Sequence, residues 1–264
     1  MAESERPRSP FAGKIDFPAR APRRVLSPDE IGRILAAHLL YVETERRQGS
    51  RADFSSADLS GMDFSGLNLR RAKMEHAILK GADLTQANLQ RANLVGAVLI
   101  GARLDGADLS GARLSGANLV SASLENACLA KADMEFALMA KAMLRGASLG
   151  AADMSGALLD DAVLTRADLR AANLRGAGFR AARLDGADLR EARLGGAFLL
   201  GASLRGADLR GAYLRLARLD GADLCGANLL GAEGLTQAQL DRAHCDSGTM
   251  VPEGLTRDAT KSHL

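Results

Sequence analysis

Residues 82–111 read ADLTQ-ANLQR-ANLVG-AVLIG-ARLDG-ADLSG when they are divided into blocks of five. Each block has Ala in its first position and Leu in its third position. The phase continues in both directions, because Leu, Met or Phe stands at every fifth residue from Phe54 to Leu229, which makes 36 consecutive pentapeptides without an insertion. A fixed period of this kind indicates a repeat architecture, in which each unit buries its apolar side against its neighbours.

The period of five excludes a helical stripe and fits a short extended segment followed by a turn. Residues five apart on an α-helix are about 140° apart and cannot share a face. In an extended segment, the Ala and the Leu point to one side and the residue between them points to the other. Gly ends the pentapeptide in 19 repeats, where a type II turn needs a positive φ. The pattern predicts a polygonal coil with Ala and Leu inside.

The repeat resembles the pentapeptide-repeat proteins over residues 52–232. Literal copies of their Ala-(Asp/Asn)-Leu-X-X motif begin at Ala82, Ala87, Ala107, Ala207 and Ala222. The resemblance implies an all-β solenoid, a right-handed quadrilateral β-helix with four pentapeptides in each coil. The chain would then form about nine coils, a rod roughly 40 Å long at the strand spacing of a β-sheet.

Both ends of the repeat have signals for caps, which protect the open edge of a stacked sheet from pairing with other chains. Residues 26–50 are expected to form an N-terminal capping helix, because Ser27 and Glu30 make a capping box around Pro28. Its apolar stripe would be Ile31, Ile34, Leu35, Leu39 and Val42. A capping box at Thr236 and Gln239 predicts a short C-terminal helical cap. The expected divisions are a polar arm over 1–25, the helix over 26–50, the β-helix over 51–232, and the cap and tail over 233–264.

Composition favours a cytoplasmic protein and excludes several classes of partner. The net charge is +2, from 34 basic and 32 acidic residues, so nothing global requires nucleic acid, and binding of nucleic acid is disfavoured. Cys128, Cys225 and Cys245 have no metal-ligand spacing, which indicates a reducing compartment. Residues 1–24 lack the apolar stretch of a signal peptide. No run approaches the ~18 apolar residues of a membrane span, so no membrane association is expected.

No catalytic, cofactor-binding or metal-binding residue is predicted, and the protein is not expected to be an enzyme. His38 lies on the apolar stripe of the capping helix and is interpreted as a packing residue, and His76 beside Glu75 as part of a solvated pair. Eleven Asp residues precede the central residue of their repeats, and Asn takes the same position in six others. Since a neutral amide substitutes so freely, local hydrogen bonds at turns explain these residues better than a metal site or catalysis.

Two surface features are candidate interaction sites if positions twenty apart share a face. Contiguous exposed apolar area usually marks an interaction site, and one face has outward apolar residues, which predict a partner or dimer interface: Ile78, Val98, Ile100, Val120, Leu138, Leu158, Phe198 and Leu200. The alternative is that Phe11, Ile15 and Phe17 of the N-terminal arm cover this face. A second face has an arginine series that could meet an acidic partner or could be neutralised by the aspartates beside it: Arg170, Arg190 and Arg210, next to Asp168, Asp188 and Asp208.

The function predicted from these features is a noncatalytic protein–protein interaction or scaffolding module. A homodimer is expected, together with a protein partner that no motif identifies. The resemblance implies one alternative, in which the rod mimics DNA, binds DNA gyrase or a related topoisomerase, and protects it from quinolones. Residues 51–232 carry 22 basic and 20 acidic residues. A uniformly acidic rod is therefore impossible, and this disfavours the alternative.

Overall fold

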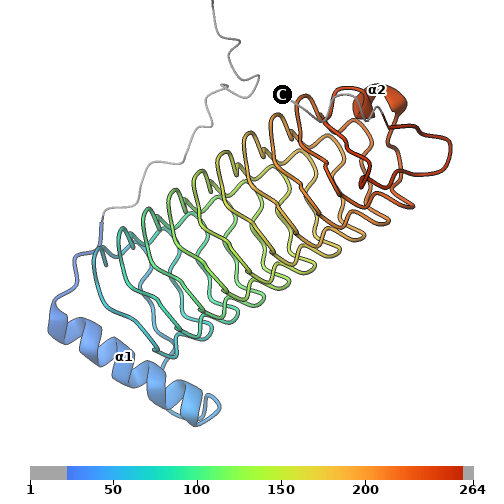
Figure 1. The fold of residues 1–264 in the computed structure, drawn as a ribbon. Helices are drawn as coiled ribbons and strands as arrows, with labels where there is room; N and C mark the ends of the chain where they lie inside the picture. Colours follow the sequence, from blue (N-terminus) through green and yellow to red (C-terminus); the bar gives the residue numbers. More distant parts are fainter. Residues whose placement is uncertain (1–22, 258–264) are drawn as a thin grey trace, which may run out of the picture.

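The computed structural model describes residues 23–257, which form a rod of stacked coils (Figure 1). Helix α1, Pro28–Glu43, lies at the N-terminal end of the rod, and helix α2, Gln237–Leu240, lies at the other end. Between them, each side of a coil contributes a single bridging residue rather than a longer strand. Within residues 23–257 no helix is long and apolar enough to cross a membrane.

Parallel bridges join residues twenty apart, from Asp53–Lys73 to Tyr213–Glu233. Each regular coil therefore holds four pentapeptides. On each side of a coil the ladder uses the N–H groups of the outward residue, the central residue and the corner residue, the last as in the Gly146 N–H that donates to the Thr165 carbonyl at 3.1 Å. The Leu144 N–H donates to the Val163 carbonyl at 2.7 Å, and the Val163 N–H donates to the Ala142 carbonyl at 2.9 Å. These bonds satisfy main-chain groups that would otherwise be costly beside a dry core.

The corners of the coils are turns with a positive φ at the last residue of every pentapeptide. This holds at all 36 corners, of which 19 are Gly and 17 are other residues with φ between 54° and 64°. The carbonyl of the central residue accepts a hydrogen bond from the N–H three residues later, as between Leu144 and Ala147 at 3.1 Å. The positive φ predicted for the Gly corners is confirmed, and the corners without Gly have the same positive φ.

The core consists of the 36 central residues and 34 Ala residues, all of them buried. Leu144 and Phe179 in the middle of the rod have no exposed surface. The two positions that lack Ala are in the first coil, where Met62 is partly buried and Leu67 is 36% exposed. The small inward position beside each corner is thus suited to a methyl group, and larger side chains are displaced from it.

The N-terminal cap contains the predicted capping box. The Ser27 hydroxyl accepts from the Glu30 N–H at 3.3 Å, and the Glu30 carboxylate accepts from the Ser27 N–H at 2.8 Å. The helix ends at Glu43 rather than near residue 50, because Glu45 and Arg46 adopt positive φ values of 51° and 76°, which a helix cannot continue through.

The buried side of α1 differs from the predicted stripe at Leu39 and at Val42, which is half-buried and is not among the side chains packed against the core. Ile31 and His38 are buried, and Leu26, Ile34 and Leu35 pack against the core. Leu39, which was expected on the stripe, is 49% exposed because it lies at the edge of the arc that faces the first coil. Arg24, before the helix, adds a parallel bridge to Ala57 of that coil.

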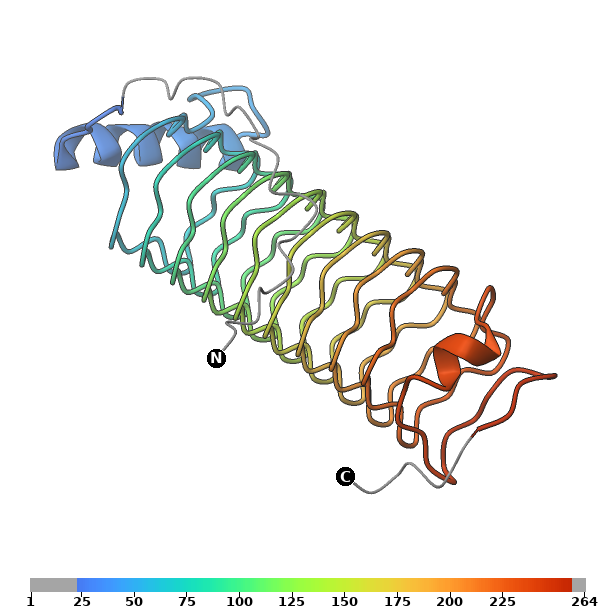
Figure 2. The same cartoon turned by 90° about the horizontal axis from the view of Figure 1, so that it is seen from above.

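The stack of coils continues beyond the last regular repeat. The bridges Asp223–His244 and Asn228–Met250 join residues 21 and 22 apart, so this last layer has extra residues, which α2 and a following turn accommodate (Figure 2). The Gln239 amide donates to the carbonyls of Leu214 at 3.0 Å and Ala217 at 2.8 Å. The cap therefore occupies carbonyl groups at the end of the stack.

Candidate functional site

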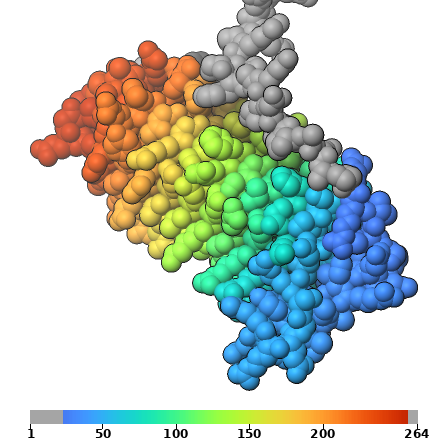
Figure 3. All heavy atoms as spheres, turned by 180° about the vertical axis from the view of Figure 1, so that it is seen from behind, coloured from blue at the N-terminus to red at the C-terminus, as the bar shows by residue number. Residues whose placement is uncertain are grey.

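The outward apolar residues of one face form a line along the rod, here called the apolar column. Parallel bridges run from Ile78 to Val98, from Val98 through Asn118 to Leu138, and from Leu138 to Leu158. Leu138 is 36% exposed and Leu158 is 48% exposed, while Ile78 and Val98 are half-buried. Because each coil lies directly on the next, side chains that are far apart in sequence become contiguous (Figure 3).

The remaining predicted members of this interface lie beside the column or beyond a gap in it. Ile100, Val120 and Leu200 follow the central residue of their repeats and are half-buried. Gly178 interrupts the column before Phe198, and it is buried because a Cβ there would lie 3.4 Å from Leu158 Cδ2. Phe11, Ile15 and Phe17, the predicted covering residues, are outside the described part of the chain.

The three arginines of the second candidate site are bound to aspartates of their own coils. The distances between guanidinium and carboxylate are 2.7 Å for Arg170–Asp168, 2.6 Å for Arg190–Asp188 and 2.6 Å for Arg210–Asp208. Hydrogen bonds from these arginines hold the pKa of each of the three carboxyls below its usual range.

Weaker contacts link neighbouring coils of this arginine ladder. Arg170 lies 3.7 Å from Asp188, and Arg190 lies 3.7 Å from Asp208. Exposed ion pairs contribute about 0–1 kcal/mol each. Since its charges are already paired, the ladder offers an acidic partner little free positive charge.

The two histidines considered in the sequence, His38 and His76, have different environments in the structure. His38 is on the buried side of α1, its Nδ1 accepts from the Ala52 N–H at 3.0 Å, and its ring stacks on Tyr41 with 5.9 Å between the ring centroids. Burial lowers the pKa of His38. His76 is exposed at a corner and lies over Gly96 of the next coil. His38 thus acts as a cap for the first coil.

The thiols of Cys225 and Cys245 are unsuited to nucleophilic chemistry. Burial raises the pKa of Cys225 to about 11 and raises the pKa of Cys245 as well, so both remain thiols at neutral pH. All three cysteines are free. Across residues 23–257, no three His, Cys, Asp or Glu side chains come together as a metal site.

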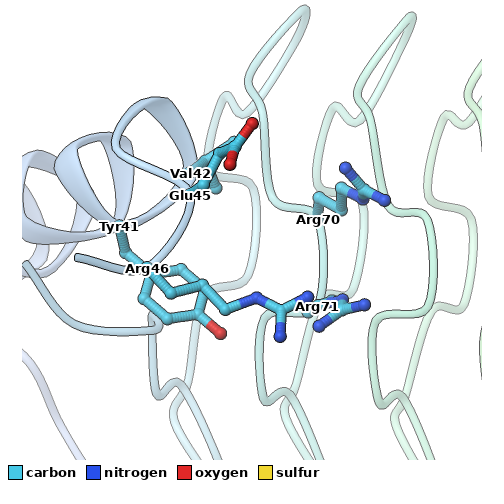
Figure 4. A pocket seen from close by; sticks show the side chains of 6 residues that line it. All are labelled: Tyr41, Val42, Glu45, Arg46, Arg70 and Arg71. Atoms are coloured by element: carbon cyan, nitrogen blue, oxygen red, sulfur yellow. The ribbon is translucent and has the colours of Figure 1, made fainter. Parts of the chain in front are cut away.

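The structure also brings together a basic cluster that the sequence patterns did not single out. Arg46, Arg70 and Arg71 line a depression of about 330 Å³ beside Tyr41 and Glu45 (Figure 4). Arg46 comes from the loop after α1, and no periodic pattern placed that loop against the coils. The available signal was the pair of adjacent arginines at one corner, with Arg91 twenty residues later.

Comparison with known proteins identifies the family. The model of pentapeptide repeats matches in eight copies over residues 50–86, 77–116, 117–156, 147–190 and 182–221, which together cover more than half of the chain. The chain belongs to the pentapeptide-repeat family. Members of this family fold as right-handed quadrilateral β-helices. A comparison with curated proteins finds no match.

Several solved pentapeptide-repeat structures are similar to this chain. HetL, involved in heterocyst differentiation regulation in the cyanobacterium Nostoc sp. strain PCC 7120, is 33% identical, with 85% of this chain and 99% of HetL covered and a TM-score of 0.35. A trypsin-treated QnrB1, a plasmid-mediated fluoroquinolone resistance protein, is 21% identical, with 78% and 91% covered and a TM-score of 0.41. A protein of the Arabidopsis thaliana thylakoid lumen is 39% identical, with 39% and 69% covered and a TM-score of 0.30.

Proposed function

We propose that this pentapeptide-repeat protein is a noncatalytic protein–protein interaction module that works through the apolar column. The observation that supports this function is the bridged pair Leu138 and Leu158, which leaves two large apolar side chains exposed on adjacent coils. Ile78 and Val98 lie on the same line, beyond Asn118. Burial of apolar surface is worth about 25 cal/mol for each Å², so a partner that covers the column gains from it.

A second copy of the chain is the partner that fits this geometry. The column runs along the rod rather than around it, so two antiparallel rods related by a two-fold axis can each present the same line of residues to the other. The proposed assembly is a homodimer in the cytoplasm, and it requires neither a cofactor nor a catalytic residue.

Binding of gyrase as a DNA mimic is the alternative and has less support. A DNA mimic needs an acidic track along the rod, whereas residues 51–232 carry 22 basic and 20 acidic residues. Carboxylates of successive coils are interspersed with cations, as in the Arg103–Asp83 pair at 2.8 Å and the Arg205–Asp223 pair at 2.8 Å.

The test compares two double variants with equal changes of charge. Leu138→Glu with Leu158→Glu alters the apolar column. Met143→Glu with Val163→Glu alters a bridged outward pair on the neighbouring face. Sedimentation velocity should show a wild-type dimer, a monomer for the first variant and a dimer for the second. Circular dichroism and melting temperature should remain close to wild type in both variants, because all four side chains point outward.

Two results would contradict the proposal. One is a dimer that survives the Leu138 and Leu158 changes. The other is a wild-type monomer that captures no protein through the column. Purified gyrase is added in the same sedimentation assay. Binding of gyrase to the wild type and to both variants would support the DNA-mimic alternative instead.

A further inference from the structure

The basic depression at the N-terminal end of the rod joins two parts of the chain. Arg46 extends from the loop after α1, while Arg70 and Arg71 occupy a corner of the coils (Figure 4). Tyr41 and Val42, in the last turn of α1, form the rest of the lining together with Glu45. The depression is open to solvent and has a volume of about 330 Å³, which is enough for a small anion and part of the molecule that bears it.

Hydrogen bonds fix the backbone that presents these arginines. The Arg46 N–H donates to the Tyr41 carbonyl at 2.8 Å, and the Arg71 N–H donates to the Gln90 carbonyl of the next coil at 2.9 Å. The Arg70 N–H donates to Asn68 Oδ1 at 3.2 Å. The three side chains therefore start from well-defined positions.

The difference between Arg70 and the arginine ladder lies in one neighbouring residue. Arg70 and Arg170 occupy equivalent positions, and each donates its N–H to the side chain two residues earlier, at 3.2 Å for Asn68 and 3.1 Å for Asp168. Asp168 also binds the Arg170 guanidinium at 2.7 Å. Asn68 keeps the turn but has no charge, so the Arg70 guanidinium has no ion-pair partner in the described residues.

The same is true of the other cations around the depression. Across residues 23–257, Arg46 and Arg71 form no ion pair, and neither does Arg91, which continues the corner twenty residues after Arg71. Glu45 is the one acidic residue in the lining, and its carboxylate is turned away from the ends of Arg46 and Arg71 (Figure 4). The cluster therefore has an excess of positive charge.

We propose that this depression binds the phosphate group of a phosphate monoester. A guanidinium group presents paired N–H donors that match phosphate oxygens. A single carboxylate would leave most of the charge of three arginines unbalanced, whereas a phosphate monoester carries about −1.5 to −2 charges and three acceptor oxygens. The Tyr41 side chain offers a hydroxyl and an aromatic ring beside the same space. The site is independent of the apolar column, which lies on a different side of the coils.

The test introduces beside Arg70 the carboxylate that each arginine of the arginine ladder already has. Asn68→Asp should give Arg70 an internal partner in the geometry of Asp168 and Arg170, without disturbing the turn. The matched control is Asn228→Asp, which makes the same change of charge in the same column of the rod, where Leu230 rather than an arginine follows. Arg70→Gln removes the cation directly.

Glycerol 3-phosphate and a capped phosphoserine are the probes, titrated at constant ionic strength while NMR follows the arginine Nε–Hε signals. Wild type and Asn228→Asp should bind with similar affinity, while Asn68→Asp and Arg70→Gln should bind about tenfold more weakly. Preference for glycerol 3-phosphate would indicate a free metabolite, and preference for phosphoserine a phosphorylated protein. Either result supports the site. Absence of binding to the wild type, or equal binding to Asn68→Asp in a folded protein, would overturn the proposal.

Discussion

At the scale of single residues, the corners show how the coils accommodate an unfavourable backbone. A residue other than Gly at positive φ costs about 1–2 kcal/mol, and 17 corners have one. The side chain at such a corner lies over the same corner of the next coil. Phe136 lies over Gly156 and His76 lies over Gly96. Gly in the following coil thus gives space to the side chain before it, as well as allowing its own positive φ.

Gly156 and Gly116 allow these two roles to be separated. Both have a φ of about 65°, but a Cβ on Gly156 would lie 2.6 Å from the Phe136 ring, whereas one on Gly116 would meet nothing within 4 Å. Gly116→Ala should lower the free energy of unfolding by about 1 kcal/mol. Gly156→Ala should lower the free energy of unfolding by a larger amount, because the added Cβ meets the Phe136 ring. Combining it with Phe136→Ala should remove this additional loss. Urea denaturation of the double-mutant cycle measures this coupling, and equal costs at both glycines would refute it.

At the scale of elements, the two caps depend on particular side chains that bind the free backbone groups of the stack. His38 of α1 accepts the Ala52 N–H, and Gln239 of α2 donates to the carbonyls of Leu214 and Ala217. In each cap the helix covers part of the end of the stack, and the polar side chain makes the hydrogen bond to the free backbone group. Together they protect the edges of the stack, where the ladder would otherwise be open to another chain.

The cap at His38 predicts a dependence of stability on pH. Burial lowers the pKa of the folded imidazole below its ordinary value of 6.5, so below that pH the unfolded chain binds more protons than the folded chain. The contribution of His38 to stability is then fully present above pH 6.5 and is lost as the pH decreases toward the pKa of the folded state. Protonation would also place a hydrogen on Nδ1, which now accepts the Ala52 N–H.

The measurement is the free energy of unfolding between pH 7 and pH 5. It should decrease in the wild type and stay nearly constant in His38→Gln, whose amide oxygen can still accept the Ala52 N–H. The control is His76→Gln, which changes an exposed histidine and should leave the wild-type slope intact. A His38→Gln variant with the full wild-type slope would show that another group causes the effect.

At the scale of the whole molecule, stability comes from many equivalent layers. The core has 36 central residues and 34 Ala residues, and bridges at a spacing of twenty residues join each coil to the next. Repeat proteins of this kind gain stability from each unit and from each interface with its neighbour. A change in a central coil weakens the interfaces on both of its sides, whereas a change on the outer surface weakens neither.

Leu144 and Leu138 test this distinction within one coil. Leu144 is fully buried and Leu138 is 36% exposed. Leu144→Ala should lower the free energy of unfolding by about 2–5 kcal/mol through lost contacts and a cavity, and Leu144→Asp should do more harm by placing an unpaired charge in the core. Leu138→Ala should change it little. Urea denaturation followed by circular dichroism gives the comparison, and tolerance of Leu144→Asp would contradict the inward assignment.

The local pattern of the sequence was sufficient to predict the corners, the inward residues and the two capping boxes. Each depends on residues that are near in the chain: Ala and Leu two apart, a turn every five residues, and Ser27 with Glu30. Leu39 and the end of α1 were predicted less well. Their environment depends on how the helix meets the first coil and on the Thr44 hydrogen bonds, which no periodicity encodes.

Only the tertiary structure decided which surface groups are free to bind. Arg70 and Arg170 have the same place in the repeat, five coils apart, and the sequence itself shows Asn68 before the one and Asp168 before the other. Only the structure shows that, across residues 23–257, no carboxylate of another coil or element pairs with Arg70. The loop that presents Arg46 meets this corner only after α1 has packed on the first coil. Outward side chains find their partners across coils and across elements, so their pairing follows the three-dimensional arrangement rather than the five-residue pattern.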